Sequence, residues 1–321
     1  MRKIVISLAV ILLFAAPWIV SAPFFVHLMI MVLMWTVLGA SWNILGGFTG
    51  QVSFGHATFL GAGAYTTMIL FLKLGIAPWY GIPIGGLVAA LIALPIGFIC
   101  FRLRGPYFAL STLAVAEIIR LVALNWESFT NGPVGLLITT LPDVTFGGRS
   151  IDWENKIPFY YIIAIISLAA IVATYIMSRT RLGAYSLAIR EDIDSAEAIG
   201  INTVQARVAA LSLSAFFAGV AGGFYAMYLR YIDPDAVFSI ALSVEMVFIA
   251  VVGGLTTVAG PLIGAIVLVA FGEIFREIFL VHFKLVGHLI FYGLMMMIVI
   301  RYLPEGIWGK LRLWFGSQRN A

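Results

Sequence analysis

The residues best placed to do chemistry in this chain lie in the segment 43–56, between two long apolar runs. Lipid cannot satisfy backbone groups that glycines free from a helix, so such backbone must pack in protein or line a wet cavity. Polar side chains at membrane depth usually face the bundle interior or a pathway. From the residues alone, simple helix packing by the glycines is favoured, and a broken or tightly packed segment beside a translocation route is the alternative. The pathway or packing residues are Asn43, Gly46, Gly47, Gly50, Gln51, Ser53 and His56. The glycines should let the chain pass close to neighbouring helices, and the polar side chains should satisfy the freed backbone groups.

Four charged residues lie inside other apolar runs and are the next candidates for a functional role: Glu117, Arg120, Glu245 and Glu273. Glu117 and Arg120 are three positions apart on a predicted helix and can pair, which would lock spans together. The alternative is a gate, or a contact for the zwitterionic head of an amino acid. For Glu245, which has no partner nearby in the sequence, we expect an interhelical hydrogen bond; contact with outer water and protonation are the alternatives. Glu273 could pair with Arg276 at the outer end of a span. A proton relay would need a chain of acids across the membrane, and the sequence shows none.

The composition excludes an ordinary soluble protein. Hydrophobic residues make up 62% of the 321 residues and charged residues 11%, whereas a soluble domain is about 25% charged. No CxxC, HExxH or Walker-type motif occurs, and the single cysteine, Cys100, cannot form an intrachain disulfide. We expect no enzyme activity and no cofactor on this chain. The net charge of +4 is small, so we expect it to set orientation in a membrane and not to bind nucleic acid.

The apolar runs predict an all-α fold, a polytopic membrane helix bundle forming one domain over 1–321. The first run, 4–20, resembles a signal peptide, but Pro23 beside the possible cleavage point favours a retained span. With it there are about ten spans, the others being 24–45, 56–73, 78–101, 106–124, 158–177, 208–228, 240–258, 261–281 and 286–303. More of the 19 Lys and Arg residues then fall inside than outside, which predicts both termini in the cytoplasm.

Two loops are long enough to have roles of their own. The outer loop, 125–157, contains turn signals and should be a surface loop or a short amphipathic lid. The inner loop, 178–207, has helical apolar spacing over 184–199, and Gly200 supplies a stop. Membrane-surface helices are usually rich in Lys and Arg on the polar face, but this one carries four acids. Its polar side is therefore expected to meet a protein, with a solvated connector as the alternative.

Four separated blocks resemble one known family in the right order: 43–57, 104–109, 190–201 and 253–261. Together they are similar to the branched-chain amino acid permeases of the LivM type, and the likeness extends from about residue 28 to 303. The resemblance implies a permease subunit of an ATP-driven (ABC) importer in the bacterial inner membrane. Its partners would be a LivH-type second permease, two ATPase subunits and an extracytoplasmic amino-acid-binding protein, with ATP and Mg bound only by the ATPases.

The resemblance also assigns roles within this chain. The inner helix would couple the spans to the ATPases through Arg190, Glu191, Asp192, Ala196, Glu197, Ala198 and Gly200. Gly253 and Gly254 would join the pathway, and they repeat the GG-x-T pattern of Gly46 and Gly47. The apolar spans favour an aliphatic cargo; urea, short amides or a sugar are the alternatives on the same fold. An ion-driven secondary transporter is the third hypothesis, although it would need no docking helix.

Overall fold

The computed structural model describes residues 13–18, 22–139, 145–146, 149–150, 155–273, 293–294, 297, 301 and 306–310. Within these residues, seven helical segments are long and apolar enough to cross a membrane. They are α2 (Pro23–Trp42) continued by η1 (Asn43–Gly47), α3 (His56–Leu74), α4 (Pro78–Cys100), α5 (Pro106–Asn125), α7 (Ile157–Arg179), α10 (Thr203–Leu229), and α11 (Pro234–Val237) followed by α12 (Ile240–Gly253).

These helices confirm the all-α fold and seven of the expected spans, with ends close to those predicted. One correction concerns the run 240–258, where the span begins earlier, at Pro234, and ends at Gly253. A shorter apolar helix, Gly260–Glu273, contains α13 (Gly260–Ala265) and the π-helix η3 (Ile266–Ala270). The expected spans 4–20 and 286–303, and the second half of 261–281, lie largely outside the described residues.

Local sequence explains where most helices begin and end. Helices α2, α4, α5, α7 and α13 carry proline in the first turn, where a missing N–H costs nothing and the ring fixes φ for the helix. Helix α3 ends at Gly75 in the left-handed conformation, which glycine adopts without strain. Helix α10 begins at Thr203, because the side chain of Asn202 accepts a hydrogen bond from the Gln205 amide.

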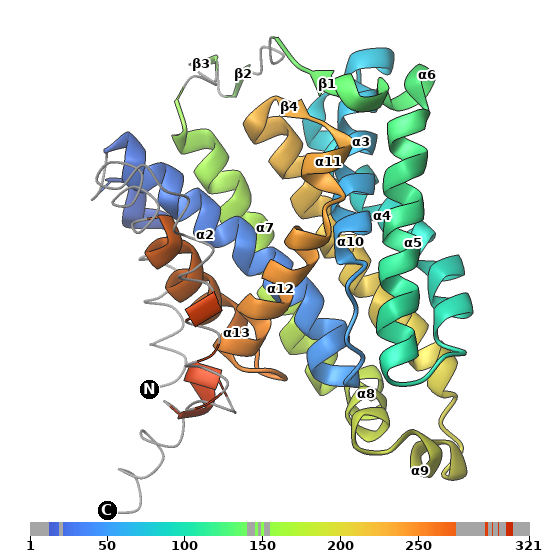
Figure 1. Ribbon diagram of the computed structural model, residues 1–321. Coiled ribbons are helices and arrows are strands. Elements are labelled where there is room, and N and C mark those ends of the chain that lie inside the picture. Colours follow the sequence, from blue (N-terminus) through green and yellow to red (C-terminus); the bar gives the residue numbers. More distant parts are fainter. Residues whose placement is uncertain are drawn as a thin grey trace, which may run out of the picture.

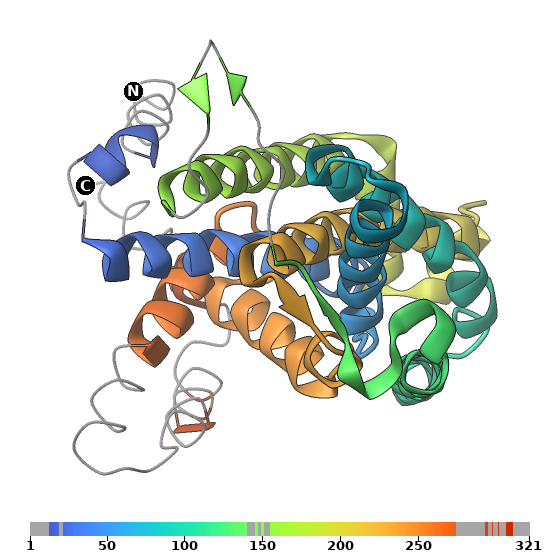
Figure 2. The same ribbon diagram turned by 90° about the horizontal axis from the view of Figure 1, so that it is seen from above.

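Helix α10 lies at the centre of the bundle, packed against α3 and α4 (Figures 1 and 2). Glycines bring these helices together: a Cβ added to Gly222 would lie 1.9 Å from the Leu60 carbonyl oxygen. In lipid the hydrophobic effect does not drive helices together, so close van der Waals contact between small residues holds them instead. Figure 2 shows α2 between α7 on one side and α12 with α13 on the other. Helix α5 lies at the edge of the bundle, and only 22% of the residues in its most apolar stretch are buried.

The two ends of the bundle carry different connections (Figure 1). Helices α8 (Arg181–Glu191) and α9 (Ile193–Ala198) lie at one end, which we call the α8–α9 end. The opposite end carries α6 (Glu127–Thr130), η2 (Gly132–Val134) and four two-residue strands, β1 (Leu136–Leu137), β2 (Thr145–Phe146), β3 (Arg149–Ser150) and β4 (Tyr231–Ile232). Strand β1 pairs antiparallel with β4, and β2 with β3. The first pairing ties the predicted outer loop to the connection between α10 and α11.

Candidate functional site

The glycine-rich segment 43–56 is less broken than the sequence predicts. Residues 43–47 form the π-helix η1, and the helix continues through Thr49, whose Oγ1 donates to the Leu45 carbonyl at 2.8 Å. Non-helical backbone begins only at Gly50, where φ is +71°. A π-turn accommodates an extra residue without ending the helix and is frequent at functional sites. The true break is therefore confined to 50–55, before His56 starts α3.

Asn43 joins α2 to the loop between α12 and α13. Its Nδ2 donates to the Thr257 carbonyl at 2.9 Å, and its Oδ1 accepts from the Thr256 amide at 3.1 Å. The side chain is fully buried, so both hydrogen bonds form away from bulk water. We call these two bonds the Asn43 clamp. A Cβ on Gly47 would lie 1.9 Å from Asn43 Oδ1 and 3.0 Å from the Thr256 nitrogen, which confirms the predicted close approach. The two GG-x-T segments are thus in contact.

The clamp belongs to a longer contact between α2 and α12, which we call the α2–α12 seam. Its residues recur every four positions, so each set lies along one face of its helix. The set on α2 and its continuation η1 is Trp35, Gly39, Asn43 and Gly47; the α12 set is Glu245, Ile249 and Gly253.

Glycine makes this seam tight, and α13 packs against it. A Cβ on Gly39 would lie 2.5 Å from Ile249 Cγ2 and 3.4 Å from Pro261 Cβ. One on Gly253 would lie 1.9 Å from the Gly260 carbonyl oxygen. Neither contact leaves room for a larger side chain without movement of a helix. Gly254 follows with φ +118° and turns the chain out of α12.

His56 is a packing residue in a buried hydrogen-bond chain. Its Nε2 lies 2.9 Å from Ser214 Oγ, and its Nδ1 lies 3.1 Å from Ser53 Oγ. Ser214 gives its only hydrogen to the Ser41 carbonyl at 2.5 Å, so the hydrogen bond with His56 must use a proton on Nε2. The sequence offered no sign of Ser214, because nothing in its helical pattern distinguishes it from other small residues of α10.

The backbone groups of residues 50–55 lie outside the helices, and only some of their hydrogen-bond partners were predicted. Ser53 Oγ accepts from the Gly55 amide at 3.3 Å, as predicted, but Trp42 Nε1 satisfies the Ser53 carbonyl at 2.8 Å. Gln51 was expected to help; it is buried, yet it makes no hydrogen bond with the described residues.

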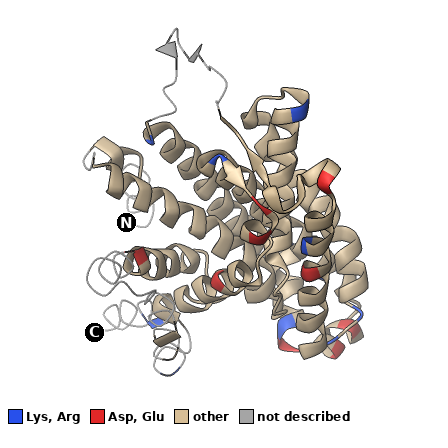
Figure 3. Ribbon diagram, turned by 45° about the horizontal axis from the view of Figure 1, so that its top comes forward, with Lys and Arg blue, Asp and Glu red and all other residues tan. Residues whose placement is uncertain are grey.

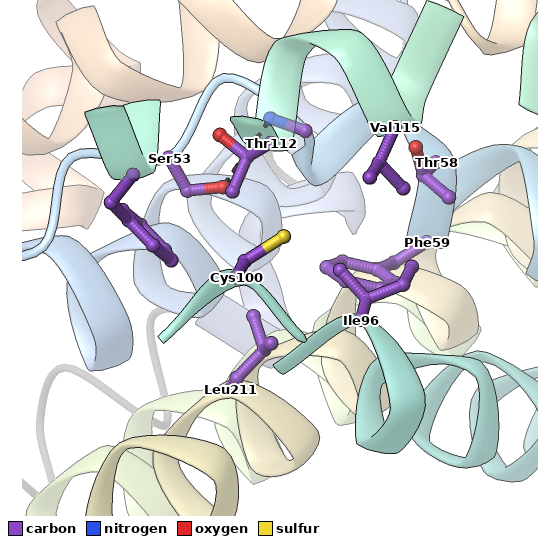
Figure 4. A pocket seen from close by; sticks show the side chains of 10 residues that line it. Ser53, Thr58, Phe59, Ile96, Cys100, Thr112, Val115 and Leu211 are labelled. Carbon is purple, nitrogen blue, oxygen red and sulfur yellow. Dashed lines mark hydrogen bonds between the residues drawn. The ribbon is translucent and has the colours of Figure 1, made fainter. Parts of the chain in front are cut away.

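A small hollow lies behind this segment (Figure 4). Cys100 and Thr112 point into the space shown there, and the Phe54 amide donates to Thr112 Oγ1 at 3.2 Å. Thr58 Oγ1 is buried without a hydrogen-bond partner among the described residues. The hollow is too small for a metabolite, and no described group of three or more His, Cys, Asp or Glu side chains could hold a metal ion.

The inner helix predicted over 184–199 is two helices, which corrects that prediction. Asp192 has extended backbone (φ −158°, ψ 121°), and its carboxylate accepts from the Ser195 amide at 2.5 Å. An aspartate in this position caps the start of a new helix, so α9 begins where one continuous helix was expected. The Ser195 backbone hydrogen bond also lowers the pKa of the Asp192 carboxyl below its ordinary value.

Helices α8 and α9 are attached to the bundle by both apolar and polar contacts. Ala196 is buried with Ile189 and Ala206. Arg104, in the connection between α4 and α5, forms a 2.8 Å salt bridge with Asp194, while Thr203 Oγ1 donates to Glu197 at 2.6 Å. Of the predicted coupling residues Ala196 is buried, and the exposed ones are Arg190, Glu191, Asp192, Glu197, Ala198 and Gly200.

The segment 43–56 and helix α8 meet directly. The position of a Cβ on Gly50 lies 3.0 Å from Arg190 Cγ and 3.5 Å from Arg190 Cα. Only a glycine with positive φ lets the chain pass so close to α8. This contact joins helix α8 to the loop that follows η1.

Most charged residues lie near the ends of the helices (Figure 3). Glu117 and Arg120 pair as predicted: Nη2 donates to Oε1 at 2.6 Å and Nε to Oε2 at 3.0 Å. Sequence reasoning missed Asp235 of α11, which also pairs with Arg120. Glu245 is half-buried, and the interhelical hydrogen bond expected for it is not formed with any described residue. Arg276, the partner expected for Glu273, lies outside the described residues.

Comparison with known proteins identifies the family. The family described as "Branched-chain amino acid transport system / permease component" matches residues 24–300. The chain belongs to this family. It is 29% identical to the high-affinity branched-chain amino acid transport system permease LivM of Escherichia coli, over 95% of this chain and 75% of the relative. The resemblance to LivM-type permeases expected from the four blocks is confirmed.

Two less similar relatives carry different names. Identity to the LivH permease of Escherichia coli is 24%, over 73% of this chain and 79% of the relative. A permease of Lactococcus lactis named for nucleosides is also 24% identical, over 60% of this chain and 63% of its own length. No solved structure matches the chain. This protein is therefore a multi-pass membrane permease component.

Proposed function

We propose that this permease is one membrane subunit of an ATP-driven importer of branched-chain aliphatic amino acids. It would form the pathway with a LivH-type second permease, receive cargo from an extracytoplasmic binding protein and be driven by two ATPase subunits. ATP and Mg would bind to the ATPases alone. The similarity to both LivM and LivH permeases supports a pair of permeases, and the aliphatic surfaces of the spans suit such a cargo.

The observation that carries the proposal is the α8–α9 pair. It lies at one end of the bundle and is held to the spans at Gly50, Arg104 and Thr203 (Figure 1). Its outward side is exposed and mixed in character; Ile199, for example, is 76% exposed. A surface that is both exposed and firmly attached to several spans can pass on the movement of a docked protein. The α8–α9 end would then face the cytoplasm of a bacterial inner membrane, with both termini on that side.

The first test is transport by the complete complex in proteoliposomes. We expect leucine uptake only when both ATPase subunits, ATP and the loaded binding protein are present. Uptake driven by an ion gradient without ATPase subunits would refute the proposal that ATP drives transport. Parallel assays with ribose, urea and a nucleoside test the cargo, because one relative is named for nucleosides.

A second test addresses the docking surface. Ile199→Glu and Glu191→Arg should each reduce uptake per ATP hydrolysed while the protein remains inserted and stable. Val134→Glu is the matched control, because Val134 is also exposed (71%) but lies at the opposite end of the bundle. Equal coupling in Ile199→Glu, Glu191→Arg and the control would place the ATPases elsewhere.

A further inference from the structure

Arg207, in the second turn of α10, is buried although it carries a charge. Its side chain is 2% exposed, as is that of Thr203 one turn before it. Helix α10 begins at Thr203, so Arg207 lies near the α8–α9 end, where a long charged side chain could extend to water. Taking a guanidinium out of water is costly unless its new neighbours offset the lost hydration. The position of Arg207 therefore depends on the contacts that hold it.

The guanidinium of Arg207 has contacts of two kinds. Its Cζ lies over the ring of Phe101, 5.1 Å from the centroid, and that ring is stacked on Phe108 of α5. Its Nε donates to the Thr203 carbonyl at 3.1 Å, and its Nη2 donates to Thr203 Oγ1 at 3.3 Å. An aromatic face attracts a desolvated cation. The contacts of Arg207 thus join α10 to the end of α4 and, through the stacked rings, to α5.

Thr203 extends this contact to α9. A hydroxyl has one hydrogen to donate, and Thr203 Oγ1 gives it to Glu197 Oε1 at 2.6 Å. The same oxygen accepts from Arg207, so the two hydrogen bonds run in one direction, from the cation to the carboxylate. Hydrogen bonds in series polarise and strengthen one another. We call the set of Arg207, Thr203 and Glu197 the α9–α10 link.

The turn between α9 and α10 shows what the link adds. Gly200 ends α9 with φ +87°, and an added Cβ there would meet nothing within 4 Å. Its amide donates to the Glu197 carbonyl at 2.9 Å, a bond that ends α9 without reaching α10. Side chains cross the turn instead: Thr203 bonds Glu197, and Ala206 is buried with Ala196. The apolar contact is non-directional, whereas the hydrogen bond fixes how α9 is oriented on α10.

We propose that Arg207 is a positioning residue for transport, which acts through Thr203 and Glu197 to make α9 and the first turns of α10 move as one body. The proposal rests on the proposed function, in which a protein docked on α8 and α9 supplies the movement. Because Arg207 is buried, it acts on α10 and not on the docked protein. Helix α10 packs against α3 and α4 at the centre of the bundle, so movement of its first turns reaches several spans.

The test uses the complete importer in proteoliposomes and measures the leucine moved per ATP hydrolysed. Arg207→Met removes the charge and keeps an apolar stem, and Glu197 is left half-exposed (46%), so no buried charge loses its partner and stability should be kept. Coupling between sites is typically worth about 5- to 150-fold, so leucine moved per ATP should fall at least about fivefold. Arg207→Lys should recover part of it. Arg179→Met is the control, because Arg179 also lies over an aromatic ring, that of Tyr175, but is exposed.

Thr203 offers a second, independent variant. Thr203→Val removes the hydroxyl at nearly constant shape and should lower the leucine moved per ATP as much as Arg207→Met does. The double variant should be no worse than either single one, because each breaks the same chain of hydrogen bonds. Thr203→Ser should restore coupling. Thr174→Val is the matched control, since Thr174 is also buried but its hydroxyl bonds within its own helix, to the Ala170 carbonyl.

Hydrogen exchange of the assembled complex reports on the link directly. ATP binding should change the exchange of α9 and of the first turns of α10 together in the wild type, but of α9 alone in Thr203→Val. An equal response of α10 in Thr203→Val would overturn the proposal.

The outcomes separate this proposal from the proposed function. If the wild-type complex shows no ATP-dependent leucine uptake, the proposed function fails. If the wild type transports but Arg207→Met and Thr203→Val match their controls in leucine moved per ATP, the α9–α10 link is wrong. Loss of folding in both variants also overturns it, because the link would then serve stability alone. Should Arg207→Met alone fail to fold, uncoupling in Thr203→Val supports the link, and normal coupling there overturns it.

Discussion

The α2–α12 seam and the cluster of Glu117, Arg120 and Asp235 both hold polar side chains on membrane helices, but in different surroundings. In the seam, Asn43 is fully buried and bonds neutral backbone groups. In the cluster, full charges meet, yet the Asp235 side chain is 67% exposed. Exposed ion pairs are worth about 0–1 kcal/mol, whereas a buried group left without its partner costs about 1–3 kcal/mol. The neutral contact should therefore matter more than the charged one.

The largest effect is expected where the seam has no space. Gly47→Leu places side-chain atoms where Asn43 Oδ1 and the Thr256 nitrogen already lie. Overpacking typically costs about 1–3 kcal/mol, and more where backbone blocks relief, so we expect loss of folding or assembly. Thermal unfolding in detergent and transport by the complex measure this. Gly293→Ala is the control, since nothing lies within 4 Å of its added Cβ. Similar stability in both variants would contradict the tight packing of the seam at Gly47.

Removing the clamp should have the next largest effect. Asn43→Ala leaves the Thr256 amide and the Thr257 carbonyl without partners, at about 1–3 kcal/mol for each group. The matched control is Asn125→Ala, because Asn125 also donates to a backbone carbonyl, that of Leu121, but is exposed. We expect a lower melting temperature for Asn43→Ala alone. Equal melting temperatures would show that water already reaches the clamp.

Breaking the charged cluster should change stability less. Arg120→Gln and Asp235→Asn should each cost up to about 1 kcal/mol at low salt. The loss should shrink in 1 M salt, where the Debye length falls to about 3 Å. A double-mutant cycle at the two salt concentrations measures the pair directly. A loss as large as that of Asn43→Ala, or one independent of salt, would reverse the order of the comparison.

The smallest effect concerns the exposed cap of α9. The folded pKa of Asp192 is lowered by the Ser195 backbone hydrogen bond, so its stabilisation is present above the unfolded pKa, about 3.9. It is lost as the pH falls through the folded value. Below pH 4 the Ser195 amide should therefore be less protected against hydrogen exchange. The Thr256 amide in the seam should show no such change. Asp192→Asn should remove the pH dependence and keep an amide cap.

The sequence predicted the helices correctly, and most of its errors concern the junctions and contacts between them. The boundaries of α3, α4 and α7 follow from apolar runs that end in proline, glycine or charge, and those signals are local. The division of α8 from α9 was missed because Asp192 fits both a polar helix face and a cap. The pairing of Glu117 with Arg120 was predicted because the residues are three apart; Asp235 was not, because it is 115 positions away from Arg120.

By itself, the sequence determined that this protein is a membrane helix bundle of the branched-chain amino acid permease family, since apolar run length and four local blocks carry that information. It also marked the glycines of 43–56 as sites of close approach. Only the tertiary structure decided what they approach: Gly47 approaches the Thr256 backbone, and Gly50 approaches helix α8. The physical reason is that helical periodicity shows which residues share a face, whereas the partner of that face is chosen by packing between helices distant in the chain.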